Sequence, residues 1–434
     1  MSTTPIERRH FLAGLTAAPM LLAPPEGSIR AARASAPRDP WAHVRAQFAL
    51  SPDRIHMAGF LLASHPRRVR DAIERYRRAL DDNPALALEQ QSVNPQMVVK
   101  PAATYLGVRP EEIALTDSTT MGLAILYHGL PLRAGDDVLT TEHDHYSTHE
   151  SLRLATQKSG ATLRKVALYE KPAAATVESM AHAIRQAIAP NTRVVAITWV
   201  HSSTGVKTPV RAIADVIAGA NAGRAPQDRI VLCVDGVHGL GVEDVTMADL
   251  GCDFFVAGTH KWLFGPRGTG VIWGRAELWP LLRPTIPAFG FQSYEAWLRG
   301  GQAPVTTADV MTPGGFHSFE HRWALGEAFE FHREIGKAQI AGRIHELNRQ
   351  CKDGLAAMKH ITLHTPRHDA VSSGLITFEV SGIGPREFVK RMRAKRIVAS
   401  STPYATSYAR LAPGLLNTPE EVDAVLREVR QLAI

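Results

Sequence analysis

The chain has 434 residues and a net charge of +7, with 45% apolar and 21% charged residues. These proportions are ordinary for a soluble globular enzyme of one large or two medium domains. The positive excess is mild and scattered and contains no aromatic-studded basic run, so we expect no nucleic-acid partner.

The first 36 residues have the pattern of an export signal. The pair Arg8-Arg9 is followed closely by Phe11-Leu12 and a moderately apolar run that is too short to span a bilayer. We therefore predict a twin-arginine (Tat) signal peptide over 1–36, engagement of the Tat export machinery, a folded chain in the periplasm, and no membrane segment in the mature form. An ordinary basic N-terminus is the alternative.

The chain after the leader alternates between strands and helices. Residues 67–80 have helical spacing, and short apolar runs at 113–116, 137–140, 194–200, 230–234 and 252–257 are predicted strands. Continuous apolar strands between helices indicate an α/β fold whose mostly parallel sheet is covered on both faces.

The pattern changes beyond Pro304. Helices are predicted at 320–334, 335–358, 385–395 and 419–432, with a strand at 375–380. We predict a large domain over 57–303 and a smaller α+β domain formed by 304–434 and 37–56.

Polar residues follow each of the five predicted strands of the large domain. They are Ser118-Thr119-Thr120, His143, His201-Ser202-Ser203, Asp235 and Lys261. The carboxyl ends of strands in open α/β sheets meet at one crevice, so these side chains are expected to converge.

Lys261 and Asp235 are the most informative of these residues. A lysine with a lowered pKa is what Schiff-base chemistry needs, whereas the plain alternative is a lysine in a surface loop. Asp235 can keep a pyridine nitrogen protonated, and His238 can bond a ring oxygen. Alternatively, Asp235 is a turn or cap residue after a strand.

Two further groups have more than one interpretation. Ser118, Thr119 and Thr120 begin a predicted helix and can bind a phosphate, although the same residues cap helices in many proteins. His143 is placed to stack on an aromatic cofactor. With His145 and His149 it also suggests a zinc site, although the spacing does not match the H-x-H-x-D-H hydrolase motif.

These residues together resemble the class V aminotransferase family. The resemblance runs from about His56 to the C-terminus and is carried by Asp235-x-x-His238, by Thr259-His260-Lys261-Trp262, and by Arg410-Leu411-Ala412-Pro413 with the following 417–423. The family comprises pyridoxal 5'-phosphate (PLP) enzymes of fold type I and includes cysteine desulfurases and isopenicillin N epimerase.

The resemblance implies a PLP cofactor, a homodimer and a set of site residues. Lys261 would bind the cofactor covalently, Asp235 would pair with the ring nitrogen, and His143 would stack on the ring as the third catalytic residue. His238 would reach the ring oxygen, and the phosphate would contact Thr119, Thr120 and His260. Arg410 would clamp a substrate carboxylate. No metal is expected.

Several positions depart from the family pattern. The 396–409 stretch contains no cysteine, so persulfide chemistry is not expected. Thr259 stands near the place of a family serine and is expected to take over its cofactor contact. His201-Ser202-Ser203 replaces a carboxylate-binding asparagine, and Gly315-Phe316-His317-Ser318 replaces the Gly-Thr motif that reaches a partner's phosphate.

The leader and the 311–323 run resemble an exported branch close to isopenicillin N epimerase, which includes the periplasmic enzyme that tailors pyoverdine siderophores. The expected reaction is at the α-carbon of an amino acid, or of an amino-acid moiety in a peptide-like or siderophore metabolite, by transamination or decarboxylation. An epimerase or a C–S/β-lyase is the alternative, and a zinc hydrolase or a non-catalytic binding protein is a more distant one. Epimerisation needs a second acid, for which the candidates are Tyr146, His201, His317 and Tyr404.

Overall fold

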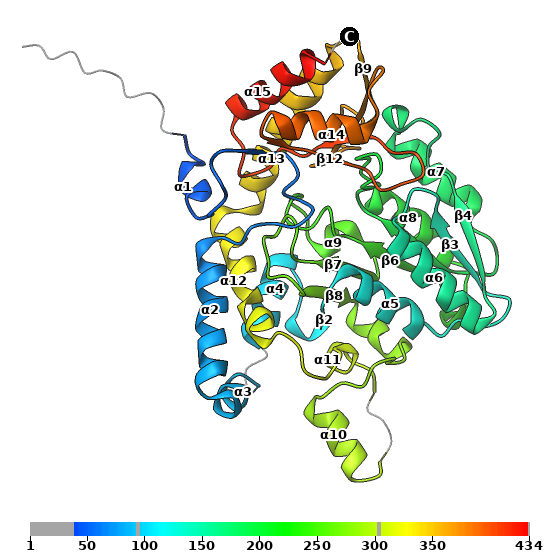
Figure 1. Cartoon of the computed structure of the whole chain (residues 1–434). Helices are drawn as coiled ribbons and strands as arrows, with labels where there is room; N and C mark the ends of the chain where they lie inside the picture. Colours follow the sequence, from blue (N-terminus) through cyan, green and yellow to red (C-terminus); the bar gives the residue numbers. More distant parts are fainter. Residues whose placement is uncertain (1–38, 93–95, 302–304, 433–434) are drawn as a thin grey trace, which may run out of the picture. The chain divides into compact units, whose positions relative to one another are not determined.

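The computed structural model describes residues 39–92, 96–301 and 305–432. The predicted leader therefore lies outside the described residues. Residues Trp41–Ile434 form one compact unit (Figure 1).

A seven-stranded sheet with the order β2-β8-β7-β6-β5-β3-β4 forms the centre of this unit. Its strands are β2 (Ile113–Thr116), β3 (Asp137–Thr141), β4 (Thr162–Val166), β5 (Thr192–Thr198), β6 (Val231–Asp235), β7 (Phe254–Gly258) and β8 (Gly270–Gly274). Neighbouring strands are parallel except β8, which is antiparallel to β2 and β7. As a result, β2, β3, β5, β6 and β7 end at the same edge of the sheet.

Helices bury both faces of this sheet, because its strands are apolar on both sides. Val194 and Ala196 of β5 belong to one buried cluster, and Val195 and Ile197 belong to another. The first cluster includes α5 (Thr119–Gly129), α6 (Tyr146–Ser159) and α11 (Ala308–Met311). The second includes α2 (Arg67–Asp82), α4 (Gln96–Leu106), α7 (Val177–Ala187), α8 (Val210–Asn221), α9 (Met247–Leu250) and α12 (Phe319–Ile335) (Figure 1).

A third buried cluster forms the C-terminal part. It combines α13 (Lys337–Ala356), α14 (Pro385–Ala394) and α15 (Pro419–Arg430) with an antiparallel sheet. The sheet order is β12 (Ser400–Ser401), β13 (Ala409–Leu411), β10 (Ile376–Val380) and β9 (Ile361–Leu363). β1 (Ile55–His56) pairs with β11 (Ile397–Val398), and Met57 is buried in this cluster. Residues 55–57 thus pack with the C-terminal part, whereas Val44, Phe60 and Ala63 of the same segment pack with the large sheet.

The remaining helices are α1 (Ala42–Arg45), α3 (Pro84–Ser92) and α10 (Phe291–Leu298). No helix in the described residues has the length and apolar character needed to cross a membrane. The large, mostly parallel sheet and the smaller antiparallel one agree with the predicted architecture, whereas the predicted domain limits stay a prediction.

Candidate active site

The structure brings Lys261 and His238 together at the carboxyl edge of the large sheet. Lys261 lies in the loop after β7, and its Nζ is 3.1 Å from Nε2 of His238, in the loop after β6. Burial lowers the pKa of Lys261 to about 8; the Asp235 charge opposes this shift, and the charge of Arg410 adds to it. A substantial fraction of this amine is therefore neutral near pH 7 to 8, as a nucleophile must be.

Asp235 is the last residue of β6 and is buried, with 2% of its surface exposed. Its Oδ1 accepts the backbone N–H of Val237 at 3.1 Å. Burial raises the pKa of Asp235 to about 6, despite that hydrogen bond and the charge of Lys261. A further positive group placed against Asp235 would stabilise the charged form of its carboxylate.

The hydrogen bonds of His238 favour one tautomer. The indole N–H of Trp262 donates to Nδ1 of His238 at 3.4 Å, so the neutral ring has its proton on Nε2. That N–H can donate to a neutral amine or to a ring oxygen, but it cannot accept from a protonated lysine. Burial also keeps the pKa of His238 well below its ordinary value. The hydrogen bond between His238 and Lys261 therefore requires an uncharged Lys261.

The N-terminus of α5 faces the end of β7. Ser118 caps the helix by accepting the backbone N–H of Met121 at 3.2 Å, so the cap interpretation of this serine holds. The hydroxyl of Thr119 accepts the backbone N–H of Gly258 at 2.8 Å, which leaves its own O–H free to donate. Thr120 is exposed.

Gly258 allows this close approach. A Cβ at Gly258 would lie 3.0 Å from Oγ1 of Thr119 and 3.1 Å from Cε1 of His260. His260 and the first turn of α5 therefore meet at one point, where the free N–H groups of a helix N-terminus favour an anion.

Thr259 is placed differently from the predicted cofactor contact. It is fully buried, and its hydroxyl lies 3.1 Å from the carbonyl oxygen and 2.5 Å from the hydroxyl of Thr269. This hydroxyl thus fastens the loop after β7 to the start of β8, and its role as a cofactor ligand stays a prediction.

His143 is held flat against Tyr169. The ring centroids are 3.8 Å apart with an interplanar angle of 7°, and Nε2 of His143 accepts the backbone N–H of Leu168 at 3.2 Å. Burial lowers the pKa of His143 to about 4, so the ring is neutral at physiological pH. Tyr169 covers one face of the ring, and His201 lies tilted to it with centroids 5.5 Å apart.

Two buried residues lie close to His143: Asp144 was assigned no role from the sequence, and His201 was predicted at the crevice as a candidate second acid. Asp144 accepts the backbone N–H of Thr198 at 2.7 Å and that of Thr141 at 2.9 Å, which ties β3 to β5. His201 is fully buried, with Nδ1 2.9 Å from the hydroxyl of Tyr169. The run His143-Asp144-His145 contains Asp144, but its histidines suggested metal binding instead.

Arg410 is a buried cation anchored by neutral groups. Its Nη1 donates to the carbonyl oxygen of Ser202 at 2.7 Å and its Nε to the hydroxyl of Ser400 at 3.1 Å. The guanidinium carbon lies 4.5 Å from the centroid of the Phe60 ring. Arg410 forms no ion pair with an acidic residue of the described chain, and burial lowers its pKa to about 10. A buried arginine in this state favours an anionic ligand.

Phe60 was missed by sequence reasoning, since a lone aromatic in a connecting segment carries no distinctive signal. Its ring also packs against His238, at a centroid distance of 5.7 Å, and stacks on Trp262 at 5.9 Å. A cavity of about 170 Å³ beside it is lined by Lys261 and mainly by apolar residues such as Leu62. Phe60 thus contacts Arg410 and lines the cavity that Lys261 also lines.

The structure gives no support to the zinc alternative. Nε2 of His149 lies 2.7 Å from the carbonyl oxygen of Thr141, and Nδ1 of His145 accepts the backbone N–H of Ser147. Across residues 39–92, 96–301 and 305–432, no three His, Cys, Asp or Glu side chains are grouped to hold a metal.

The four candidates for a second acid have different surroundings. Tyr146 is 71% exposed, His201 is fully buried, and His317 lies 3.1 Å from the carbonyl oxygen of Gly315. The hydroxyl of Tyr404 lies 2.6 Å from that of Ser202, next to Arg410. Burial raises the pKa of Tyr404 to about 12. The charge of Asp235 also raises this pKa, whereas the charge of Arg410 lowers it. Tyr404 is therefore the candidate at the crevice.

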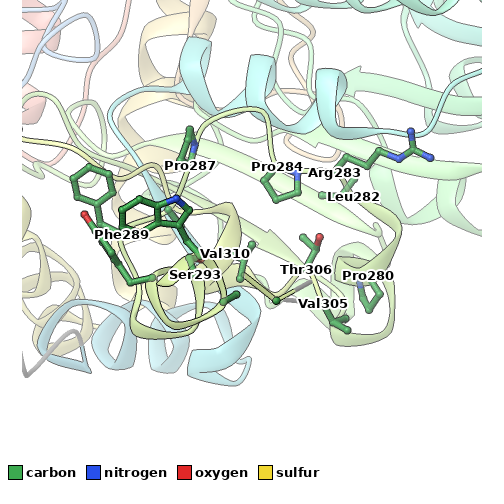
Figure 2. A pocket seen from close by; sticks show the side chains of 15 residues that line it. Pro280, Leu282, Arg283, Pro284, Pro287, Phe289, Ser293, Val305, Thr306 and Val310 are labelled. Atoms are coloured by element: carbon green, nitrogen blue, oxygen red, sulfur yellow. The ribbon is translucent and has the colours of Figure 1, made fainter. Parts of the chain in front are cut away.

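A larger cavity, of about 840 Å³, lies around α10 and the loop before it (Figure 2). Its lining is mostly apolar and includes Phe289, Tyr294, Trp297 and one charged residue, Arg283. None of the residues at the carboxyl edge lines it, and it offers no acid–base pair.

The residues of the crevice fit PLP. Asp235 is a buried carboxylate that a protonated pyridine nitrogen would satisfy, and Lys261 supplies an amine for the aldehyde. The first turn of α5, with Thr119, Thr120 and His260, supplies donors for the phosphate. His143, held neutral and flat against Tyr169, would lie against the ring.

Comparison with known proteins agrees with this fit. The model of the family "Aminotransferase class-V" matches residues 63–425. The chain is 25% identical over 342 residues to a probable cysteine desulfurase of Halalkalibacterium halodurans, covering 73% of this chain and 76% of that protein. It is 26% identical over 338 residues to isopenicillin N epimerase of Streptomyces clavuligerus, covering 74% and 80% respectively.

Solved structures show the same fold. A mutant of C-DES with glycine covalently linked to its PLP cofactor superposes with a TM-score of 0.79 at 19% identity, covering 89% of this chain and 98% of that one. The apo structure of a cysteine desulfurase from Thermococcus onnurineus NA1 gives 0.77 at 20% identity, covering 90% and 97%. The predicted fold class is thereby confirmed. Since the family model spans most of its length, this chain belongs to the class V aminotransferase family of PLP-dependent enzymes.

Proposed function

We propose that this enzyme acts at the α-carbon of an amino acid, or of an amino-acid moiety in a larger metabolite. The observation that carries this proposal is the buried Arg410, which has no acidic partner in the described chain and stacks on Phe60, a residue that lines the same cavity as Lys261. A ligand with an amino group that reaches the Lys261 site and a carboxylate that pairs with Arg410 matches these two residues.

The residues of the chain divide the chemistry among them. PLP, when bound, supplies an aldehyde and a ring that accepts the electrons released when a bond to the α-carbon breaks. Asp235 holds the ring nitrogen, His143 covers one face, and Arg410 fixes the carboxylate end of the substrate. The amine of Lys261 would move a proton at the α-carbon of the substrate.

We favour transamination or decarboxylation as the reaction, on a peptide-like or siderophore metabolite. Epimerisation and C–S or β-elimination are the alternatives, and relatives named isopenicillin N epimerase and cysteine desulfurase keep them open. The 396–409 stretch provides Ser400, Ser401 and Thr402 but no cysteine, which argues against a desulfurase. The hydroxyl of Ser400 and the carbonyl oxygen of Ser401 accept hydrogen bonds from Arg410.

We also propose that the enzyme works in the periplasm as a homodimer. The Arg8-Arg9 leader supports export. Large apolar side chains exposed on and near α10 support association with a second copy: Phe289, Phe291, Trp297, Leu298 and Phe316 are each more than half exposed.

The proposal is tested by hydrogen exchange at the α-carbon. The PLP-loaded enzyme is incubated in D₂O with a panel of amino acids and short peptides, and deuterium incorporation is followed by mass spectrometry. Exchange on at least one amino acid is expected, and Arg410→Gln should slow it at least about tenfold, as expected for loss of a charged hydrogen-bond pair. Exchange that is equally fast in Arg410→Gln would contradict the assigned carboxylate site.

A further inference from the structure

His145 has a fixed tautomer. It caps α6, and its Nδ1 accepts the backbone N–H of Ser147 at 3.2 Å and lies 2.8 Å from the Ser147 hydroxyl. A backbone N–H can only donate, so Nδ1 must be the acceptor. The neutral imidazole of His145 therefore has its proton on Nε2, and that nitrogen is a hydrogen-bond donor.

The surroundings of His145 place it at the same crevice as Arg410. Its ring meets that of Tyr404 edge to face, with centroids 6.1 Å apart and an interplanar angle of 82°. Tyr404 lies 2.6 Å from the hydroxyl of Ser202, whose carbonyl oxygen accepts from Arg410 at 2.7 Å. A continuous series of contacts thus joins the two residues.

Electrostatics agree with this placement. Burial lowers the pKa of His145, and the charges of Lys261, His149 and Arg410 lower it further. Within the described residues, Nε2 of His145 has no hydrogen-bond partner. A neutral donor beside an arginine that lacks an acidic partner is suited to share an anion with it, since two donors can each bind one oxygen of a carboxylate.

We propose that His145 is a second carboxylate-binding residue, which donates from Nε2 to the substrate carboxylate held by Arg410. This inference rests on the proposed function, because it assumes an amino-acid ligand in the crevice. It narrows the substrate class to amino acids, or metabolites ending in one, whose carboxylate is free. Substrates with an amidated or peptide-bonded carboxyl group would lose one oxygen acceptor and its charge.

Two variants of His145 separate its two hydrogen-bonding roles. In His145→Asn the short amide can still accept from Ser147 and cap α6, but it cannot reach the Nε2 position. In His145→Gln the longer amide places an N–H₂ donor near the Nε2 position. Thermal unfolding of both variants checks that α6 is intact.

The probes are glycine and glycinamide, which differ in the free carboxylate. Their dissociation constants for the PLP-loaded protein are measured by calorimetry. We expect His145→Asn to weaken glycine binding about tenfold, as for a hydrogen bond to a charged group, and to leave glycinamide binding unchanged. His145→Gln should recover most of the lost glycine affinity.

An unchanged glycine affinity in a folded His145→Asn protein would overturn the role of His145, as would equal weakening for glycine and glycinamide. Failure of the wild-type protein to bind PLP at all would instead overturn the proposed function. The absorbance of the loaded wild-type protein, recorded before the titrations, separates these two failures.

Discussion

Lys261 is the residue on which the chemistry depends, and its neighbours determine its charge. Burial removes water from the amine and favours the neutral form, while the carboxylate of Asp235 favours the protonated form. Trp262 adds a third influence by keeping the proton of His238 on Nε2, which faces the amine.

This balance predicts how PLP incorporation depends on pH. Because the pKa of Lys261 is lowered to about 8, the amine is mostly protonated below that pH and neutral above it. The rate at which apoprotein takes up PLP should rise with a midpoint near pH 8, as followed by stopped-flow absorbance. In Asp235→Asn the stabilising negative charge is lost, so the midpoint should move to lower pH. A midpoint of PLP uptake at about pH 10.4 in the wild-type protein, the ordinary pKa of lysine, would show that the amine is not buried in solution.

The convergence of site residues was predictable where one motif carried them, while their roles stay predictions. Lys261, Asp235 and His238 follow strands in a short, specific order, and the structure brings all three together. Phe60 and Tyr169 could not be predicted, because their contacts with Arg410 and His143 join segments far apart in sequence. His145 carried a signal that pointed to metal binding, and only its bond to Ser147 shows a different use.

At the scale of elements, the phosphate end of the site depends on how closely α5 approaches β7. The hydroxyl of Thr119 accepts a hydrogen bond from the backbone N–H of Gly258, and a Cβ on that glycine would crowd Thr119 and His260. The last residue of β7 thus sets the position of the helix N-terminus.

Gly258→Ala should therefore weaken PLP binding. The added Cβ would lie 3.0 to 3.2 Å from atoms of Thr119 and His260, so the helix has to shift by a few tenths of an ångström. Overpacking of this kind costs roughly 1–3 kcal/mol, and we expect PLP affinity, measured by fluorescence titration, to fall about tenfold. Gly219→Ala in α8, where nothing lies within 4 Å, is the matched control and should bind PLP normally. Equal affinity in the two variants would contradict the close-approach argument.

Most long elements could be predicted because their apolar spacing is regular. The predicted strand 113–116 coincides with β2, and the helix predicted at 385–395 corresponds to α14. β4 was missed because it lies at the edge of the sheet and is only partly buried, which leaves its sequence polar. The antiparallel insertion of β8 between β2 and β7 could not be predicted, since strand order depends on long-range pairing.

At the scale of the whole molecule, export is a separate property from catalysis. The Arg8-Arg9 pair is predicted to act in export and lies outside the described residues. Replacing both with lysine should leave the enzyme in the cytoplasm with its cofactor bound, as judged by cell fractionation and immunoblotting. Unchanged periplasmic accumulation of this variant would show that the Tat pathway is not used.

The central claim is that Lys261 binds PLP covalently. Purified, dialysed wild-type protein should show an absorbance band at about 400–430 nm, the general expectation for a lysine-bound cofactor of this kind. Borohydride should abolish the band and leave a pyridoxyl group on the peptide that contains Lys261, as detected by mass spectrometry. Lys261→Ala should be colourless after dialysis. An identical band in Lys261→Ala, or a pyridoxyl group on a different lysine, would contradict the claim.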